Sequence, residues 1–436
     1  MKNLEWAARA IFFETLKAVD LPAMIRQRGR LEGGLLWFDD KAYDLSRYAE
    51  VVLIGIGKAS LVMGHAVESL LGGRLTRGLL VTNRRAPLPV KSEIIVAGHP
   101  VPDAHSLRAG KRVIKILNSC SPDSLVIFLI SGGGSSLFEA PISDEITLED
   151  LQQLNQILVE CGATIEEINV VRKHFSAVKG GKLRQCMKAG QAIALLVSDV
   201  NTGDFKTLAS NPLFPEEEPT GRFQAITEKY LLSDKLPRLF EQFHSPLLPE
   251  GSKADEGHEP RIEAFLLAEN ADAVQAAERL ARSLDYIVRV DRTDDEEPYQ
   301  KTAARMIQAV AELKSTNPDD PVCVISGGEV SCPVRGRGFG GRNQEFALYC
   351  AVKLREAQLA RSLVLSCGTD GIDGKSIAVG AVAPSSPASN EWIDASSLRH
   401  SFEQSDTTSW LNGAGGLVVT GPTGNNLRDL RIILSL

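Results

Sequence analysis

The sequence predicts an α/β protein of two domains, and three observations lead to that prediction. Its 436 residues exceed what a single hydrophobic core usually supports. Uninterrupted apolar runs recur along the chain, with amphipathic helical stretches between them, which is typical of parallel sheets with crossover helices. The segment at 245–263 is rich in proline, glycine and charge, so the boundary between the two domains is expected there.

Each apolar run has the length of a strand that is buried on both faces. The runs are VVLIGIG at 51–57, LVIFLISGGG at 125–134, AIALLVSDV at 192–200, VCVISGGE at 322–329 and LVLSCGTDG at 363–371. Helical stretches are predicted at 148–162 and 270–285, and an amphipathic helix is predicted at 1–19. The class is therefore α/β.

The domain ranges follow from the position of the polar segment. We place an N-terminal domain at 1–247, a linker at 248–260 and a smaller C-terminal α/β domain at 261–436. The first helix carries charged residues among its apolar ones, so it is not a signal peptide. No apolar stretch approaches the roughly 18 residues that would span a bilayer. We expect a cytoplasmic protein with no membrane partner.

Charge and cysteine content exclude further classes. The formal net charge of −7 gives no basic footprint for nucleic acid, so local cations must meet any anionic substrate. The 7 cysteines are scattered without the paired spacing of a zinc site. We interpret them as reduced thiols, mostly in the core. The oligomeric state stays open, with a homodimer as one alternative.

The run at 131–136, SGGGSS, is the strongest candidate for binding nucleotide phosphates. It follows a predicted strand and precedes a helix-like segment, so its bare N–H groups and hydroxyls can form a nest for phosphate oxygens. The candidate residues are Ser131, Gly132, Gly133, Gly134 and Ser135. The alternative is a simple tight turn. The chain has no G-x-x-x-x-G-K-[ST] motif, which disfavours a P-loop ATPase.

Lys58 is a second candidate, because it follows Gly55-Ile56-Gly57 at another strand end. A flexible ammonium group there can reach a transferring phosphoryl group or a carboxylate. The alternative is a solvated lysine. Since the helix macrodipole disfavours a cation at a helix N-terminus, this position favours an anionic partner.

The segment RGRGFGGRNQE at 335–345 contains G-x-G-x-x-G, which alone is a weak dinucleotide signal. No acidic residue closes a strand about 20 positions later to bind a ribose. Three arginines, Arg335, Arg337 and Arg342, instead fill the loop with guanidinium groups suited to carboxylate or phosphate oxygens. We interpret the segment as an anion-binding loop.

Acidic residues follow several of the predicted strands, namely Asp199, Asp204, Glu329, Asp370 and Asp373. One or two carboxylates together with ATP oxygens suffice for magnesium, and Asp199 and Asp204 are the predicted metal ligands. The alternative for Asp370 and Asp373 is that they form Asp-Gly turns.

The basic segment at 169–183 surrounds a Gly-Gly pair and is either a solvated helix face or a phosphate-facing loop. Its Lys182 is assigned to the nucleotide, as is Asp199. His99 and His174 have no serine or cysteine partner pattern, so both are interpreted as structural.

These segments together resemble the glycerate 2-kinases of the MOFRL family, whose members are also labelled hydroxypyruvate reductases. The matching stretches are GIGKAS, AGHPVPDAHSLRAGKR, SGGGSSL, GATIEEINVVRKHFSAVKGGKL, ISGGEVSCPVRGRGFGGRNQE, CGTDGIDG and GPTGNNLRDL, in family order. The resemblance implies an N-terminal Rossmann-like three-layer domain and a smaller C-terminal domain with a mixed sheet. It also implies an interdomain cleft in which ATP, Mg²⁺ and D-glycerate give 2-phosphoglycerate.

The family's catalytic lysine and arginine correspond to Lys58 and Arg342. We predict that five residues bind the substrate, namely Lys58, Glu329, Arg342, Asn343 and Asp370. We expect Arg342 to bind the carboxylate or the transferring phosphoryl group, and Lys58 to neutralise the charge that develops there.

The sequence departs from the family pattern at 198–212, and SDTTSWL and GPTGNN near the C-terminus also differ from it. Relatives read approximately S-D-V-x-G-D-D and A-S-G-P, whereas this chain has SDVNTGDF, which puts Phe205 in the place of an acid, and ASNP, which puts Asn211 in the place of a glycine. Because Asn211 precedes Pro212, we expect extended backbone there. Two alternatives stay open: an NAD(P)H-dependent hydroxypyruvate reductase, and a non-catalytic relative with an altered metal site.

Overall fold

The computed structural model describes residues 3–436 apart from 201–202, 204, 217–218, 220, 242–258, 294–295, 360 and 387–394. The chain forms two compact units. The first comprises Leu21–Val197 and Asp204–Leu267, and we call it the Rossmann-like unit. The second comprises Met1–Asp20, Ser198–Gly203 and Ala268–Leu436, and we call it the mixed-sheet unit.

The Rossmann-like unit is built on a six-stranded sheet of order β6-β5-β4-β7-β8-β9. Strands β6 to β8 are parallel, as expected for apolar runs that are joined by crossover helices. Numbered along the chain, this order is that of a doubly wound dinucleotide fold. The strands are β4 (Glu50–Ile56), β5 (Arg77–Thr82), β6 (Glu93–Val96), β7 (Ser124–Ser131), β8 (Gln191–Val197) and β9 (Arg261–Ala268).

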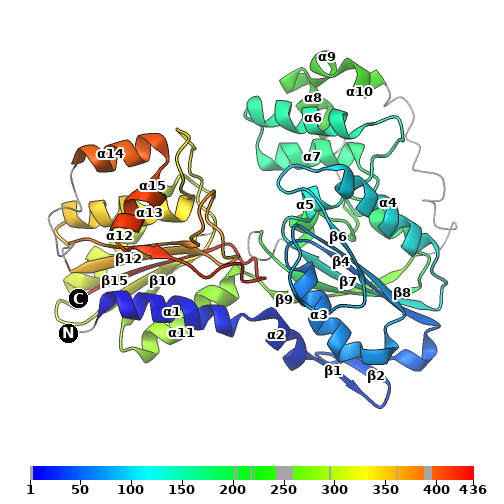
Figure 1. Ribbon diagram of the computed structural model, residues 1–436, viewed down its shortest axis with the longest axis horizontal. Coiled ribbons are helices and arrows are strands. Elements are labelled where there is room, and N and C mark those ends of the chain that lie inside the picture. Colours follow the sequence, from blue (N-terminus) through cyan, green and yellow to red (C-terminus); the bar gives the residue numbers. More distant parts are fainter. Residues whose placement is uncertain are drawn as a thin grey trace. The chain divides into compact units, whose positions relative to one another are not determined.

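Helices cover this sheet, and a small antiparallel sheet of β1 (Gly29–Glu32), β2 (Leu35–Phe38) and β3 (Lys41–Asp44) belongs to the same unit. In Figure 1, α6 to α10 gather at one end of the unit. The helices are α2 (Leu21–Arg28), α3 (Ser60–Leu71), α4 (Ala104–Asn118), α5 (Gly134–Leu137), α6 (Leu148–Glu160), α7 (Ile165–Phe175), α8 (Arg222–Tyr230), α9 (Leu232–Lys235) and α10 (Pro237–Glu241), with 3₁₀ turns at Lys182–Cys186 and Phe205–Ser210.

The mixed-sheet unit has a six-stranded sheet of order β10-β11-β15-β12-β13-β14, in which β10 and β11 are parallel and the other neighbours antiparallel. The C-terminal strand β15 lies in the middle, between β11 and β12. The strands are β10 (Ile287–Asp291), β11 (Val322–Ser326), β12 (Ser362–Gly368), β13 (Gly380–Pro384), β14 (Leu417–Val418) and β15 (Asp429–Ser435).

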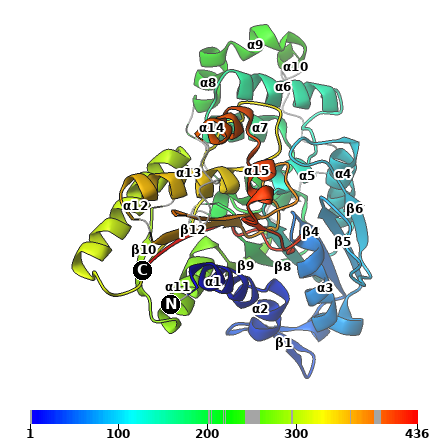
Figure 2. The ribbon, with the colours of Figure 1, turned by 60° about the vertical axis from the view of Figure 1, so that its left-hand side comes forward.

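Helices lie on both faces of this second sheet. Figures 1 and 2 show α1 beside α11 on one face and α12 with α13 on the other. Because Ala8, Ile11 and Phe12 are fully buried against this core, the N-terminal helix belongs to the mixed-sheet unit. The helices are α1 (Leu4–Ala18), α11 (Asn270–Ser283), α12 (Tyr299–Thr316), α13 (Arg342–Glu356), α14 (Ala395–Gln404) and α15 (Thr407–Gly413).

The predicted fold class and the five predicted strands are confirmed, as are the three predicted helices. The two units divide the chain differently from the predicted ranges in three places, one of which is Ser198–Gly203 in the mixed-sheet unit. Residues 1–20 lie in the mixed-sheet unit, and β9, placed at the start of the C-terminal domain, is the sixth strand of the Rossmann-like sheet. Most of the predicted linker lies outside the described residues. Among the helices that the structure describes, none is long and apolar enough to cross a membrane.

Candidate active site

The order of the Rossmann-like sheet reverses between β4 and β7, because the chain proceeds from β4 to one edge and from β7 to the other. The two strands pair in parallel, with Ile56 opposite Ile130. Ligands of doubly wound sheets bind at such a reversal, outside the carboxyl ends of the strands. Lys58 follows β4 and the loop at 131–136 follows β7, so the fold brings both predicted segments to this point.

Gly57 allows the two segments to approach closely. Its φ is +125°, and a Cβ added there would lie 2.3 Å from the carbonyl oxygen of Ser131. The backbone N–H of Lys58 donates to the oxygen of Gly132 (2.9 Å), and the N–H of Ala59 donates to Oγ of Ser131 (3.0 Å). Gly57 is therefore required by packing, and the close approach that it allows fixes the position of the Lys58 backbone beside the loop.

The loop at 131–136 presents backbone N–H groups that donate to no other described residue. Within the described residues, the N–H groups of Gly132, Gly133, Gly134 and Ser135 have no hydrogen-bond partner. Gly133 has φ +81°, a left-handed conformation that glycine adopts without strain. Successive free N–H groups in such a turn form a concavity for anions. This is the arrangement predicted for binding phosphate.

Lys58 and His99 both lie against Gly133. A Cβ on Gly133 would lie 3.0 Å from Cγ of Lys58 and 3.1 Å from Cδ2 of His99. Burial, together with the charge of Lys58, lowers the pKa of His99 to about 4, so its ring is neutral at pH 7. Sequence reasoning interpreted His99 as structural. The signal that could have located it beside the loop is its place in AGHP, just after β6.

The expectation of extended backbone at Asn211 is wrong. Residues Ala209, Ser210 and Asn211 all have left-handed φ, at +52°, +59° and +53°. Asparagine is among the non-glycine residues that tolerate this region best. Its side chain also stabilises the turn, because it accepts from the N–H of Phe214 (3.0 Å) and donates to the oxygen of Phe214 (2.9 Å). Local hydrogen bonding outweighs the influence of the following proline.

The turn at 209–211 packs on the glycine loop. Oγ of Ser210 lies 2.7 Å from Oγ of Ser135. A Cβ on Gly134 would lie 2.6 Å from Cβ of Ala209. Asn211 is 1% exposed, its side-chain amide is engaged within its own turn, and its φ of +53° is one that a glycine also adopts without strain.

The basic segment at 169–183 is largely engaged within the protein. Nζ of Lys182 donates to the carbonyl oxygens of Lys173 (2.6 Å) and Ser176 (2.8 Å) at the end of α7, where a cation is favourable. Lys179 is buried and paired with Glu139. These contacts hold the segment together. They explain the positions of Lys179 and Lys182 through partners within the protein, with no need of a ligand.

Asp199 is the described member of the predicted metal pair, and Asp204 lies outside the described residues. Oδ2 of Asp199 accepts from Nδ2 of Asn426 at 2.7 Å. No group of three or more His, Cys, Asp or Glu side chains in the described part of the chain is arranged to hold a metal ion. A single carboxylate fits Mg²⁺ only if phosphate oxygens and waters complete the coordination, as is usual for this ion.

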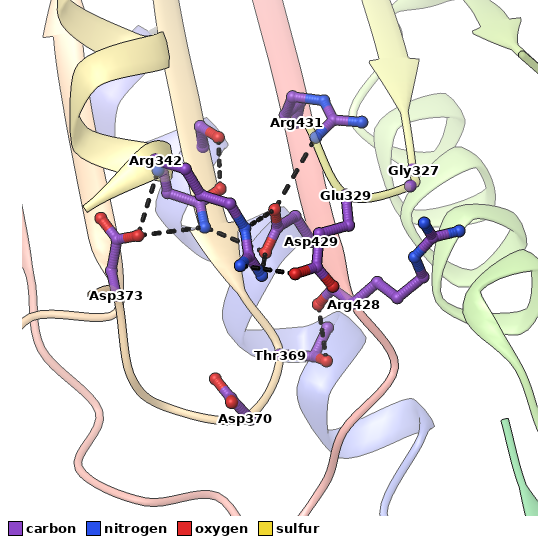
Figure 3. A network of polar contacts seen from close by, with 12 residues as sticks. Gly327, Glu329, Arg342, Thr369, Asp370, Asp373, Arg428, Asp429 and Arg431 are labelled. Carbon is purple, nitrogen blue, oxygen red and sulfur yellow. Dashed lines mark hydrogen bonds and ion pairs between the residues drawn. The ribbon is translucent and has the colours of Figure 1, made fainter. Parts of the chain in front are cut away.

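A network of charged residues lies at the carboxyl ends of β11 and β12, in the mixed-sheet unit. Because β15 runs antiparallel between them, its first residue, Asp429, lies opposite Gly368 at the end of β12. Arg342 is the first residue of α13 and reaches the same place. Its Nε and Nη2 donate to Oδ2 and Oδ1 of Asp429 at 2.7 and 2.9 Å, and its Nη1 lies 2.7 Å from Oε1 of Glu329 (Figure 3).

Two of the five N–H donors of Arg342 are hydrogen-bonded to Asp429, and Nη1 forms the ion pair with Glu329. Within the described residues, one hydrogen on each terminal nitrogen has no partner, and the side chain is 33% exposed. The guanidinium group can therefore still bind a carboxylate or phosphate oxygen. Its charge, however, is shared with two acids of the protein, which sequence reasoning did not anticipate.

Asn343 and Asp373 support this network. Nδ2 of Asn343 donates to Oδ1 of Asp429 (2.9 Å), and its Oδ1 accepts from Ser366 (2.6 Å). Asp373 accepts from the backbone N–H groups of Asn343 and Gln344, so it caps the N-terminus of α13. Complete burial raises the pKa of Asp373 to about 6, although these two N–H groups oppose the shift. Both side chains act on the helix that carries Arg342.

The loop at 335–341 is not a dinucleotide fingerprint. It does not directly follow a strand, because β11 ends at Ser326, and a Cβ on Gly336 or Gly338 would lie within 2.7 Å of backbone atoms of Gln404 or Asp406. These glycines are therefore required by packing against 404–406. The loop lines a cavity of about 270 Å³ that Arg342 and Lys375 also border.

Of the three loop arginines, Arg335 pairs with the buried Glu345 at 2.7 Å, and Arg337 is exposed. Asp370 accepts from the N–H of Ile372 (3.1 Å), which is the turn-forming role considered as its alternative. Figure 3 shows Asp370 apart from the pair formed by Arg342 and Asp429. The main residue that sequence reasoning missed is Asp429. Its signal was an acid at the start of the last apolar run, which lies at the ligand-binding edge only if that strand is antiparallel.

Rossmann-like strand order, a glycine loop at its reversal and an arginine-acid network on a second sheet define an α/β protein of two units. Residues 7–244 match the family described as a domain of unknown function, DUF4147, and residues 322–429 match the MOFRL family. The chain therefore belongs to the glycerate 2-kinase family.

Relatives that match nearly the whole chain support this assignment. D-glycerate 2-kinase of Thermotoga maritima is 33% identical over 88% of this chain and 90% of its own. The crystal structure of glycerate kinase from the same organism superimposes with a TM-score of 0.80 at 29% identity, covering 100% of both chains. An Agrobacterium vitis relative that is 35% identical over 88% of this chain and 86% of its own is named, provisionally, a hydroxypyruvate reductase.

Proposed function

We propose that this protein is a glycerate 2-kinase, which transfers the γ-phosphoryl group of ATP to the 2-hydroxyl of D-glycerate and releases 2-phosphoglycerate and ADP. The observation that carries this proposal is the run of unpaired N–H groups at Gly132–Ser135, at the reversal of the sheet and beside Lys58. Relatives of matching length named glycerate 2-kinase supply the reaction.

In this proposal the Rossmann-like unit binds the nucleotide. The free N–H groups of the loop at 131–136 donate to phosphate oxygens, and they do so without reorganisation because the backbone already holds them in place. Lys58 neutralises the charge that develops on the transferring phosphoryl group. Lys182, through its bonds to the end of α7, supports the segment beside this loop.

Magnesium is the proposed metal, held by Asp199 and Asp204 together with phosphate oxygens. When bound, Mg²⁺ neutralises charge on the β- and γ-phosphate oxygens. The use of ATP, a cytoplasmic metabolite, is consistent with a cytoplasmic protein.

Glycerate is assigned to the mixed-sheet unit in this proposal. The two N–H hydrogens of Arg342 that remain available bind the carboxylate of glycerate. Glu329 and Asp370 offer oxygen acceptors for its hydroxyl groups. Asn343 contributes indirectly, because its amide holds Asp429.

The two alternatives have less support. The glycine pattern at 336–341 contributes nothing to a reductase, because Gly336 and Gly338 pack against 404–406 and Gly341 packs against Asp373. The non-catalytic alternative rested partly on Asn211, whose φ of +53° lies in a region that a glycine also adopts without strain. A test of the reductase is direct: we expect no hydroxypyruvate-dependent loss of NADH absorbance.

The experiment that tests the proposed function is ³¹P NMR of the purified protein with ATP, MgCl₂ and D-glycerate. We expect ADP and the resonance of 2-phosphoglycerate to appear together, with no signal from 3-phosphoglycerate. L-glycerate at the same concentration is the matched control, and we expect much slower turnover. If D-glycerate remains unphosphorylated while the protein is folded, the proposed function is wrong.

A further inference from the structure

Two carboxylates share Arg342, and they share it unequally. Asp429 is fully buried and receives two parallel hydrogen bonds, from Nε at 2.7 Å and from Nη2 at 2.9 Å. Glu329 receives one contact, from Nη1 to Oε1 at 2.7 Å, and 42% of its side chain is exposed. A bidentate pair is both stronger and more specific than a single contact. Asp429 is therefore the counter-ion of Arg342, and Glu329 is the weaker partner.

Further contacts reinforce the difference. Asp429 also accepts from Nδ2 of Asn343 at 2.9 Å, and its Oδ2 lies 3.8 Å from Nη1 of the buried Arg431. Within the described residues, Oε2 of Glu329 has no hydrogen-bond partner. Asp429 is thus saturated by donors, while the partly exposed Glu329 keeps one oxygen atom without a partner among the described residues.

The proton affinities of the two acids diverge accordingly. Burial alone would raise the pKa of Asp429, but the charge and hydrogen bonds of Arg342 outweigh it and hold that pKa below its usual value. The packed surroundings raise the pKa of Glu329, and Arg342 offsets this only in part. Two neighbouring carboxylates with pKa values moved apart are the usual arrangement when one of them handles a proton.

The geometry points to Glu329 as the proton acceptor of the reaction: its free Oε2 takes the proton of the hydroxyl that is phosphorylated, while Asp429 positions Arg342 and limits its contact with Glu329. This inference rests on the proposed function. The hydroxyl oxygen forms a bond to the γ-phosphorus, and the bond from that phosphorus to the bridging oxygen breaks, leaving its electron pair on ADP. The proton moves to Oε2 and then to solvent.

Four charged groups of the described residues act on Glu329. Arg342 and Arg428 lower its pKa, whereas Asp429 and Asp199 raise it. Arg428 is itself paired with Glu296 at 3.1 Å, so part of its charge is neutralised. Burial is the largest influence and raises the pKa of Glu329 despite the two arginines, which leaves a base stronger than an ordinary glutamate.

The first test is Glu329→Gln, which keeps the shape of the side chain and removes its ability to accept the proton. We expect kcat to fall by about 100-fold or more, the usual contribution of a general base, with KM for ATP within about twofold. The acidic limb of the pH profile of kcat/KM should disappear. The matched control is Glu296→Gln, an exposed acid that pairs with Arg428, for which kcat should stay within about twofold.

The second test is Asp429→Asn, read out by the pH profile of kcat/KM. A purely structural role of Asp429 would not shift that profile. Losing the negative charge and releasing Arg342 towards Glu329 both lower the pKa of Glu329, so the acidic limb of the profile should move to lower pH. A limb that stays in place or moves to higher pH contradicts the role of Asp429. If this variant does not fold, Glu329→Gln decides alone.

The outcomes separate this inference from the proposed function. If the wild-type protein does not phosphorylate glycerate, both are wrong. If it does and Glu329→Gln retains more than about a third of kcat with an unchanged pH profile, only the assignment of Glu329 as proton acceptor is overturned.

Discussion

The glycine loop at 131–136 and the network around Arg342 meet the same requirement, the binding of anionic groups, by opposite means. The loop uses backbone N–H groups, at Gly132–Ser135, that have no partner among the described residues. The network uses side chains, and nearly all of them are engaged by one another. Arg342 is held by Asp429 and Glu329, and Asn343 by Asp429 and Ser366.

The difference concerns what each region can lose. Backbone donors need no counter-ion, so the loop depends on conformation and on the glycines that permit it. A buried guanidinium does need one, because an unpaired charge away from water is costly. We therefore expect the loop to be sensitive to added volume, and the network to be sensitive to the loss of either partner in a pair.

The largest expected effect in the network comes from Arg342→Ala. It leaves Asp429, which is fully buried, without its counter-ion, so the free energy of unfolding should fall by about 3 kcal/mol. Turnover should be abolished. Chemical denaturation and steady-state kinetics measure both. Arg337→Ala, in the same loop and exposed, is the matched control and should change stability by less than about 0.5 kcal/mol. Near-normal activity of Arg342→Ala would contradict its assigned role.

In the loop region the corresponding substitution is Gly57→Ala. Its Cβ would lie 2.3 Å from the carbonyl oxygen of Ser131 at a φ of +125°, so the segments that carry Lys58 and Gly132 must separate. We expect a loss of about 2 to 4 kcal/mol in the free energy of unfolding and a fall in kcat/KM. Gly73→Ala, where no atom lies within 4 Å, is the control. Equal stability of the two variants would refute the packing argument.

Asp373 should make the stability of the network depend on pH. Its pKa is raised to about 6, so between the unfolded value near 4 and pH 6 the folded state retains a proton that the unfolded state has lost. Stability from this residue is therefore present at low pH and is lost as pH rises through 6, by up to about 3 kcal/mol. Asp373→Asn, which stays neutral, should gain on the wild type over that range. A stability difference that is constant with pH would show that Asp373 does not titrate there.

The smallest effects are expected at Asn211. Asn211→Gly suits the φ of +53° but loses two hydrogen bonds to Phe214, so stability should change by less than about 1 kcal/mol and turnover by less than about twofold. Asn211→Ala neither favours the left-handed φ nor keeps the hydrogen bonds, so the free energy of unfolding should fall by about 1 to 2 kcal/mol. A tenfold gain in turnover for the glycine variant would mean that the asparagine obstructs the site.

The sequence predicted what depends on local pattern. Buried strands show as apolar runs, and the glycines and serines at 131–136 mark a strand end directly, so the position of this candidate loop was predictable. Asp429 was missed because its position depends on β15 running antiparallel in the middle of a sheet, which no local pattern reveals. The pairing of Arg342 was missed for the same reason. Asn211 was misjudged because its own side-chain bonds override the influence of Pro212.

Nucleotide binding, we claim, depends on the open backbone of the loop and not on the paired network. Isothermal titration calorimetry with a non-hydrolysable ATP analogue and Mg²⁺ tests it most directly, on the wild type, Gly133→Ala and Glu329→Gln. We expect Gly133→Ala, whose φ is +81°, to bind at least tenfold more weakly than the wild type, and Glu329→Gln to bind within about twofold. Wild-type affinity in Gly133→Ala, or a large loss in Glu329→Gln, would contradict the claim.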